Sequence, residues 1–196
     1  ALDGAEHVAD GAAHPGVVGA RIMIGGVAAA EADAEGIDRI MAAATAHGLP
    51  VNVLAWGALD TLDNAARRNP DTQIVLDHIG LPQPFKPPPP SEPFADLPKV
   101  LALAEHDNLA IKISGAGTLS REPFPYTDIW APLMEVFEAF GLERCLWGTD
   151  WTRAVNLLDY EQGVEAFRLT EVLSDGDREM LMGGSLERIY GWRPMR

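Results

Sequence analysis

Cys145-Leu-Trp-Gly-Thr-Asp-Trp-Thr-Arg153 is the stretch from which we infer the fold, because an apolar run ends there and a carboxylate follows it. The apolar segment 142–147 is short for a helix, and Gly148 and Thr149 interrupt it, so we expect a buried strand that ends at Asp150. A carboxylate at a strand end is solvated yet rigidly held, as a catalytic acid or base must be. Aspartate is also a favoured helix N-cap, so the pattern fits Asp150 as a cap equally well.

The rest of the chain alternates between strand and helix patterns. Apolar runs predict earlier strands at residues 19–24, 51–56, 73–80 and 109–115. Helical spacing, with Gly or Pro at the ends, predicts helices at 28–47, 59–68, 97–106, 127–140, 158–172 and 175–182, a short turn at 185–190, and a short helix or loop at 1–16. This alternation indicates an α/β fold with a parallel sheet, in a single domain over residues 1–196. Two architectures fit: a five-stranded doubly wound sheet, or part of an eight-stranded (β/α)8 TIM barrel, which typically needs about 250 residues.

A proline-rich segment separates the third predicted strand from the next helix. Residues 80–98 hold eight of the fifteen prolines, which excludes both a helix and a central strand. We therefore expect a long loop here, either a lid over a site or a solvated linker.

Composition narrows the class of ligand. The 196 residues include 15 basic and 29 acidic side chains, and the net charge of −14 argues against nucleic acid or an anionic membrane surface as a partner. No run approaches the roughly 20 apolar residues of a membrane span, and the lone Cys145 lies in an apolar run, where we expect a buried structural thiol. These features suit a small-molecule ligand and a cytoplasmic location.

Polar residues follow three of the predicted strands. The carboxyl ends of parallel strands share one edge of a sheet, so we expect His78, Ser114 and Asp150 to meet there. His78 could instead be a core histidine bonded to a carbonyl, and Ser114 lacks the Gly-x-Ser-x-Gly setting of a nucleophile. We assign Ser114 and Trp56, which ends the second predicted strand, to substrate binding. The other histidines are expected to be solvated: His7, His14, His47 and His106.

Three motifs, taken in order, resemble a known family. They are Val75-Leu-Asp-His-Ile-Gly-Leu-Pro82, Ile111-Lys-Ile-Ser-Gly115 and Leu146-Trp-Gly-Thr-Asp-Trp151. As a set they are similar to strand motifs of the amidohydrolase-related (amidohydrolase 2) TIM-barrel hydrolases, closest to the branch containing 2-pyrone-4,6-dicarboxylate lactonase. The resemblance extends over nearly the whole chain.

The resemblance implies roles for specific residues. Asp150 would be the general base toward a hydrolytic water, and His78 would polarise a carbonyl or bind a metal. Arg21 would grip a carboxylate of a small carboxylated lactone or similar cyclic ester, since guanidinium offers a fixed fork of donors. Arg121 falls where a second such arginine is expected, although an ordinary surface charge fits it equally well.

One departure from the family bears on the whole site. The family carries a His-x-His pair on its first strand, and this chain has none. With about five of eight strands visible, the resemblance implies the C-terminal two-thirds of a barrel, without its N-terminal strands. His78 and Asp150 would bind a divalent metal such as zinc poorly by themselves, because a catalytic zinc site normally has three protein ligands.

Two alternatives to a lactonase remain. One is a metal-dependent decarboxylase or amide hydrolase on the same barrel. The other is a non-catalytic domain that forms a homo-oligomer, because an incomplete barrel exposes sheet edges and apolar faces that must be covered.

Overall fold

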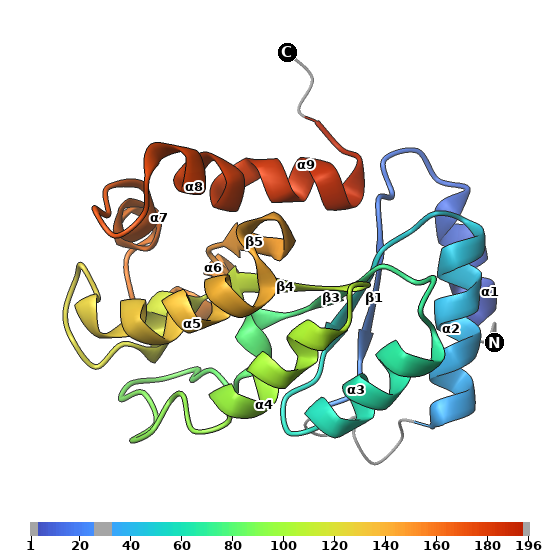
Figure 1. The fold of residues 1–196 in the computed structure, drawn as a ribbon, viewed down its shortest axis with the longest axis horizontal. Helices are drawn as coiled ribbons and strands as arrows, with labels where there is room; N and C mark the ends of the chain where they lie inside the picture. Colours follow the sequence, from blue (N-terminus) through green and yellow to red (C-terminus); the bar gives the residue numbers. More distant parts are fainter. Residues whose placement is uncertain (1–3, 26–32, 194–196) are drawn as a thin grey trace.

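The computed structural model describes residues 4–25 and 33–193, whose centre is one parallel sheet (Figure 1). Its five strands run in the order β1-β2-β3-β4-β5. They are β1 (Ala20–Met23), β2 (Val51–Leu54), β3 (Ile74–Leu76), β4 (Leu109–Ser114) and β5 (Cys145–Gly148). The predicted α/β class with a parallel sheet is confirmed.

Helices connect the strands and follow the last one. They are α1 (Gly4–Ala12), α2 (Ala34–Ala46), α3 (Leu59–Arg68), α4 (Leu97–Ala102), α5 (Trp130–Phe140), α6 (Trp151–Ala154), α7 (Tyr160–Arg168), α8 (Asp175–Glu179) and α9 (Ser185–Tyr190). Single 3-10 turns extend α4 over Leu103–Glu105 and precede α5 over Thr127–Ile129, and a π-helical segment, Met180–Gly184, joins α8 to α9. Residues 28–32 of the predicted helix 28–47 lie outside the described residues.

The predicted boundaries around β5 and α7 were wrong. Residues 142–144 form a 3-10 turn rather than the start of β5, because Gly141 takes a positive φ and the chain must turn before the sheet. The predicted helix 158–172 is shortened to α7, which begins after Asp159 and ends at Arg168.

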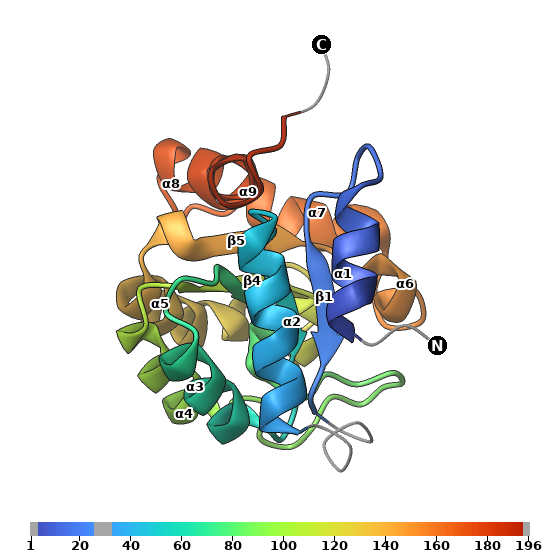
Figure 2. The ribbon, with the colours of Figure 1, turned by 90° about the vertical axis from the view of Figure 1, so that its right-hand side faces the viewer.

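The two faces of the sheet are covered differently. Side chains alternate along a strand, so Ile74 and Leu76 pack with the buried residues of α2, α3, α4 and α5, whereas Val75 points to the other face. There Val75, Ala110 and Leu146 pack against α9. Figures 1 and 2 show α9 on the side of the sheet away from α3 and α4.

This arrangement separates the two candidate architectures. A doubly wound sheet reverses its strand order at a switch point and carries helices of its crossovers on both faces. Here the order never reverses, and the connecting helices α2 to α5 pack on one face, as around a barrel. No helix in the described ranges is long and apolar enough to cross a bilayer.

The chain leaves the sheet earlier at β3 than predicted. The strand ends at Leu76, and His78, Ile79 and Gly80 all take positive φ, at 54°, 60° and 70°. Positive φ at a non-glycine residue costs about 1–2 kcal/mol, so packing must hold this turn in place. As a result His78 stands beyond the strand and faces β4, instead of lying within the predicted strand 73–80.

Candidate active site

Three polar side chains meet beyond the carboxyl ends of β3, β4 and β5. His78 Nδ1 lies 2.8 Å from Ser114 Oγ and 3.6 Å from Asp150 Oδ2. The ring of Trp56, just after β2, lies 5.8 Å from the His78 ring, centroid to centroid. The expected meeting of His78, Ser114 and Asp150 is confirmed, whereas their chemical roles stay predictions.

Asp150 stands at the start of α6 without capping it through its side chain. It takes a left-handed backbone conformation, with φ 51°, and its carbonyl oxygen accepts hydrogen bonds from the amides of Arg153 and Ala154. In the described part of the chain its carboxylate makes no capping bond. Instead Oδ2 accepts a 2.5 Å hydrogen bond from Arg153 Nε, so the side chain serves the site rather than the helix.

The surroundings of His78 keep its imidazole neutral. The side chain is 13% exposed, and burial lowers its pKa more than any other influence. The charges of Asp150 and Asp77 oppose this effect, whereas Arg21 and Arg153 add to it, and the net pKa is lowered. A neutral imidazole can give or accept a hydrogen bond at neutral pH, as a group beside a reacting carbonyl or water requires.

A cluster of charged side chains lies on the face of the sheet that carries Ser114. Asp77, 2% exposed, bonds Arg21 Nε at 2.7 Å and Lys112 Nζ at 3.0 Å. Burial raises the pKa of Asp77, but Lys112 and Arg21 together outweigh burial and hold the pKa below its ordinary value. Sequence reasoning missed Lys112, although Lys112 is two positions before Ser114 on β4 and its side chain must therefore lie on the same face of the sheet.

The candidate substrate arginines have different surroundings. Arg21 is tied to Asp77, but its side chain remains 50% exposed, so its guanidinium is accessible to a ligand. Arg121 is an exposed residue, and its Nη1 donates to the carbonyl oxygen of Ser91 in the proline-rich loop at 3.1 Å. A carboxylate-binding role stays a prediction for both.

Arg153 also belongs to the site, and sequence reasoning did not predict this. Arg153, 6% exposed, bonds Asp150 and also reaches Gln83 and Pro84 in the proline-rich loop. Gln83 in turn donates to the carbonyl oxygen of Ser114 at 2.9 Å. The spacing of three between Asp150 and Arg153 could have suggested the first contact, but nothing in the sequence indicated the partner Gln83.

A cavity of about 750 Å³ opens beside this cluster, between the sheet and α9. His78, Ser114 and Lys112 line it together with Asn52, and the rest of the wall is largely apolar, including Val17, Leu146, Leu186, Tyr190 and Trp192. This volume lies within the roughly 300–1,000 Å³ typical of small-molecule sites. A mostly apolar wall with a few polar groups suits a small ring compound that carries polar substituents.

Trp56 offers one further donor near His78. Its indole Nε1 is buried and has no hydrogen-bond partner; within the described residues, no other buried side-chain nitrogen or oxygen lacks one. Buried polar atoms are normally satisfied, so a ligand oxygen is a natural acceptor for this group. Substrate binding by Trp56 stays a prediction that this observation supports.

The expected donors at this edge do not by themselves fit a catalytic metal. His78 Nδ1 is already 2.8 Å from Ser114, and Asp150 Oδ2 is bound by Arg153. They are two donors, against the three protein ligands of an ordinary catalytic zinc site. We therefore derive no step through a metal from these residues.

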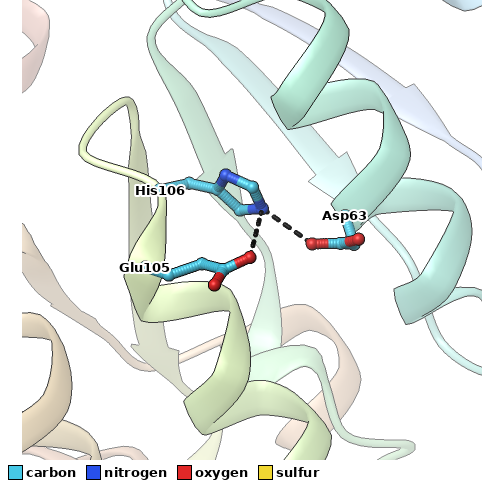
Figure 3. A group of neighbouring side chains, drawn as sticks. All are labelled: Asp63, Glu105 and His106. Carbon is cyan, nitrogen blue, oxygen red and sulfur yellow. Dashed lines mark hydrogen bonds and ion pairs between the residues drawn. The ribbon is translucent and has the colours of Figure 1, made fainter.

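Another group has ligand atoms spaced as a metal would need. One ligand atom each of Asp63, Glu105 and His106 lies within 4.8 Å of the other two (Figure 3). Asp63 is on α3, and Glu105 and His106 precede the amino end of β4, the opposite end from Ser114. Arg67 Nη2 already contacts both carboxylates, at 3.3 and 3.0 Å. His106 was wrongly expected to be solvated: its side chain is largely buried, and its Nε2 lies 2.7 Å from Asp63 Oδ1. The other three histidines are exposed, as expected.

Comparison with known proteins identifies the family. The model of the amidohydrolase family (Amidohydro_2) matches residues 3–192. The chain belongs to the amidohydrolase family. A search of curated proteins finds no significant match.

Several solved structures share this fold. An amidohydrolase from Burkholderia multivorans with bound zinc has a TM-score of 0.79 and 22% identity, with 98% of this chain and 72% of that one covered. A protein described as a probable 2-pyrone-4,6-dicarboxylic acid hydrolase from Acinetobacter baumannii, with citric acid bound, has a TM-score of 0.67 and 20% identity, with 90% and 65% covered. A dihydroxybenzoic acid decarboxylase from Polaromonas, with manganese, has a TM-score of 0.50 and 14% identity, with 79% and 53% covered. The five strands therefore match part of the TIM barrel of these proteins.

Proposed function

We propose that this amidohydrolase chain belongs to a hydrolase that adds water to a small carboxylated lactone or a similar cyclic ester. One observation carries the proposal: Asp150 Oδ2 lies 3.6 Å from the largely buried, neutral imidazole of His78, which lines the 750 Å³ cavity. A carboxylate and an imidazole this close can act on one water and one carbonyl.

The step needs a base and a polarising group. Asp150 removes a proton from a water while the water oxygen attacks the ester carbonyl, and His78 stabilises the oxygen that gains negative charge. The carbon–oxygen bond of the ring then breaks as protonated Asp150 gives its proton to the ring oxygen, so the product carries a new hydroxyl group and a new carboxylic acid group, which ionises in water. Among the described residues the hydrogen bond and the ion pairs of Asp150 use Oδ2, which leaves Oδ1 as the oxygen that would take the proton of the water.

Charge distribution favours an anionic substrate despite the net charge of −14. Lys112 lines the cavity, and Arg21, half exposed, shares its partner Asp77. Two cations against one buried carboxylate leave a local excess of positive charge beside the cavity. This excess would hold a carboxylate of the substrate and orient its ring toward His78.

The experiment measures hydrolysis of 2-pyrone-4,6-dicarboxylate, and of simpler carboxylated lactones, by the protein as the cell makes it. We expect ring opening that Asp150→Asn reduces by about 10²–10⁴-fold, the usual contribution of a general base. Metal analysis and chelation in the same preparation test whether the activity needs a divalent metal, since two similar solved structures hold zinc or manganese. Loss of a carboxyl group as CO₂, or hydrolysis of amides alone, would instead support the decarboxylase or amide hydrolase alternative.

An oligomerising domain without catalysis is the alternative from another class. Exposed apolar side chains support it: Met23 on the edge strand β1 is 54% exposed, and Trp192 beside the cavity is 47% exposed. A tight oligomer that is inert toward every ester tested would favour this alternative, which sedimentation together with the ester assay decides.

A further inference from the structure

We propose that Arg153 is a positioning residue that couples the carboxylate of Asp150 to the proline-rich loop, which in the structure spans residues 81–96, between the turn His78–Gly80 and α4. This inference rests on the proposed function of Asp150 as a base. It assigns a task to a buried cation that the proposed chemistry does not itself use.

The guanidinium of Arg153 bridges three separate parts of the chain. Its Nε donates to Asp150 Oδ2 and its Nη1 to the carbonyl oxygen of Pro84, both at 2.5 Å. Its Nη2 donates to Gln83 Oε1 at 2.5 Å and to Thr118 Oγ1 at 3.1 Å. With 6% of the side chain exposed, water cannot replace these acceptors without movement of the loop or of the arginine.

The same loop holds the other two members of the site. Gln83 Nε2 donates to the carbonyl oxygen of Ser114 at 2.9 Å and to that of His78 at 3.3 Å. Gln83 therefore contacts the backbones of His78 and Ser114 with one end of its amide, and Arg153 with the other. When the loop is seated, all three site residues are fixed by one connected set of bonds.

The contact between Arg153 and Gln83 is packed directly against Gly115. A Cβ at Gly115 would lie 2.3 Å from Gln83 Oε1 and 2.4 Å from Arg153 Nη2. Gly115 also has φ +69°, which side chains rarely adopt. Glycine is thus the residue that lets Gln83 and Arg153 meet at this point.

The largely buried charge of Asp150 is what couples its orientation to the position of the loop. Asp150 is 13% exposed, and an ionised carboxylate in such a place needs a charged or hydrogen-bonding partner. If the loop leaves, Arg153 loses two acceptors, Gln83 Oε1 and the carbonyl oxygen of Pro84, and can follow the loop or turn to solvent, which frees Asp150 from this arginine. Loop closure and the orientation of the base are then one event, and a closed loop also excludes water from the site.

A purely structural Arg153 makes a different prediction. If the arginine only fastens the loop to α6, then the charge of Asp150 has no influence on the loop. The discriminating measurement is therefore hydrogen exchange of protected amides at the start of the loop, in four proteins: wild type, Arg153→Met, Asp150→Asn and the double variant. Suitable amides are that of Leu81, which donates to the carbonyl oxygen of His78 at 3.2 Å, and that of the buried Gln83.

We expect Arg153→Met to speed exchange of these amides by roughly tenfold or more, since hydrogen bonds to charged groups contribute about 1.5–3 kcal/mol. Asp150→Asn should speed exchange severalfold when Arg153 is present and leave it unchanged in the Arg153→Met background. Arg168→Met, which removes an exposed contact with Glu165 on α7, is the matched control and should leave the loop unchanged. Exchange that Asp150→Asn does not alter, or alters equally in both backgrounds, would overturn the coupling.

Kinetics give the second readout. In a protein that hydrolyses a lactone, Arg153→Met should lower kcat at least tenfold with KM changed less than about threefold, because the residue orients the base rather than holding the substrate. A tenfold rise in KM with unchanged kcat would contradict a role of Arg153 in positioning Asp150. If the wild-type protein hydrolyses no lactone, the proposed function fails, and the exchange experiment still decides whether Arg153 couples Asp150 to the loop.

Discussion

Replacing Asp77 with asparagine tests the electrostatic description of the cavity wall. The substitution keeps the shape of the side chain but removes the charge between Lys112 and Arg21. Removing one partner of a fully buried ion pair costs about 3–5 kcal/mol. Here Lys112 is 28% and Arg21 50% exposed, so water can solvate both cations in part, and we expect a smaller loss of about 2 kcal/mol.

The pH dependence of this effect has a definite sign. The pKa of Asp77 is lowered in the folded state, whereas an aspartate in an unfolded chain has a pKa of about 3.9. Its contribution to stability is therefore complete above about pH 4 and is lost as the pH falls through the folded-state pKa. The difference in stability between wild type and Asp77→Asn should be largest near neutral pH and should shrink in acid.

Urea unfolding followed by circular dichroism, repeated from pH 7 down to pH 3, measures both effects. Lys112→Met and the double variant complete a cycle that isolates the pair, for which we expect a coupling of about 1 kcal/mol. A loss below about 0.5 kcal/mol at pH 7, or a gap that widens in acid, would refute the reasoning.

Two further predictions concern single positions. Cys145 is fully buried and burial raises the pKa of its thiol to about 12, so iodoacetamide at pH 8 should label it only at the rate of unfolding; rapid labelling of the folded protein would contradict this. Gly115→Ala should destabilise the protein by about 1–3 kcal/mol in the same urea assay, through its positive φ and its clash with Gln83 and Arg153, whereas Gly11→Ala, where no atom lies within 4 Å of the added carbon, serves as the control and should not.

Much of the fold could be predicted because local patterns and tertiary structure agree. Apolar runs placed all five strands, and α8 begins directly after Ser174, which forms a capping box with Asp177, a start signal of purely local origin. The errors lie where backbone geometry overrides side-chain pattern. Ile79 extends the apolar run of β3, yet it sits in a left-handed turn that no hydrophobic pattern reveals.

The sequence predicted those site residues that lie at or just beyond the carboxyl ends of strands. His78, Ser114 and Asp150 were expected together because parallel strands share one edge, and they are together. Gln83 could not be found this way, because its position depends on the path of a proline-rich loop with no period. The burial of His106 was missed for a similar reason: its partner Asp63 lies 43 positions earlier, on α3.

The central claim is that Asp150 is the base of a hydrolase site. The most direct measurement compares wild type and Asp150→Asn for the rate of ring opening of a carboxylated lactone, with circular dichroism to show that both are folded. The account predicts that the variant keeps its fold and loses at least about 10²-fold in kcat. A folded Asp150→Asn that opens the ring at the wild-type rate would contradict it.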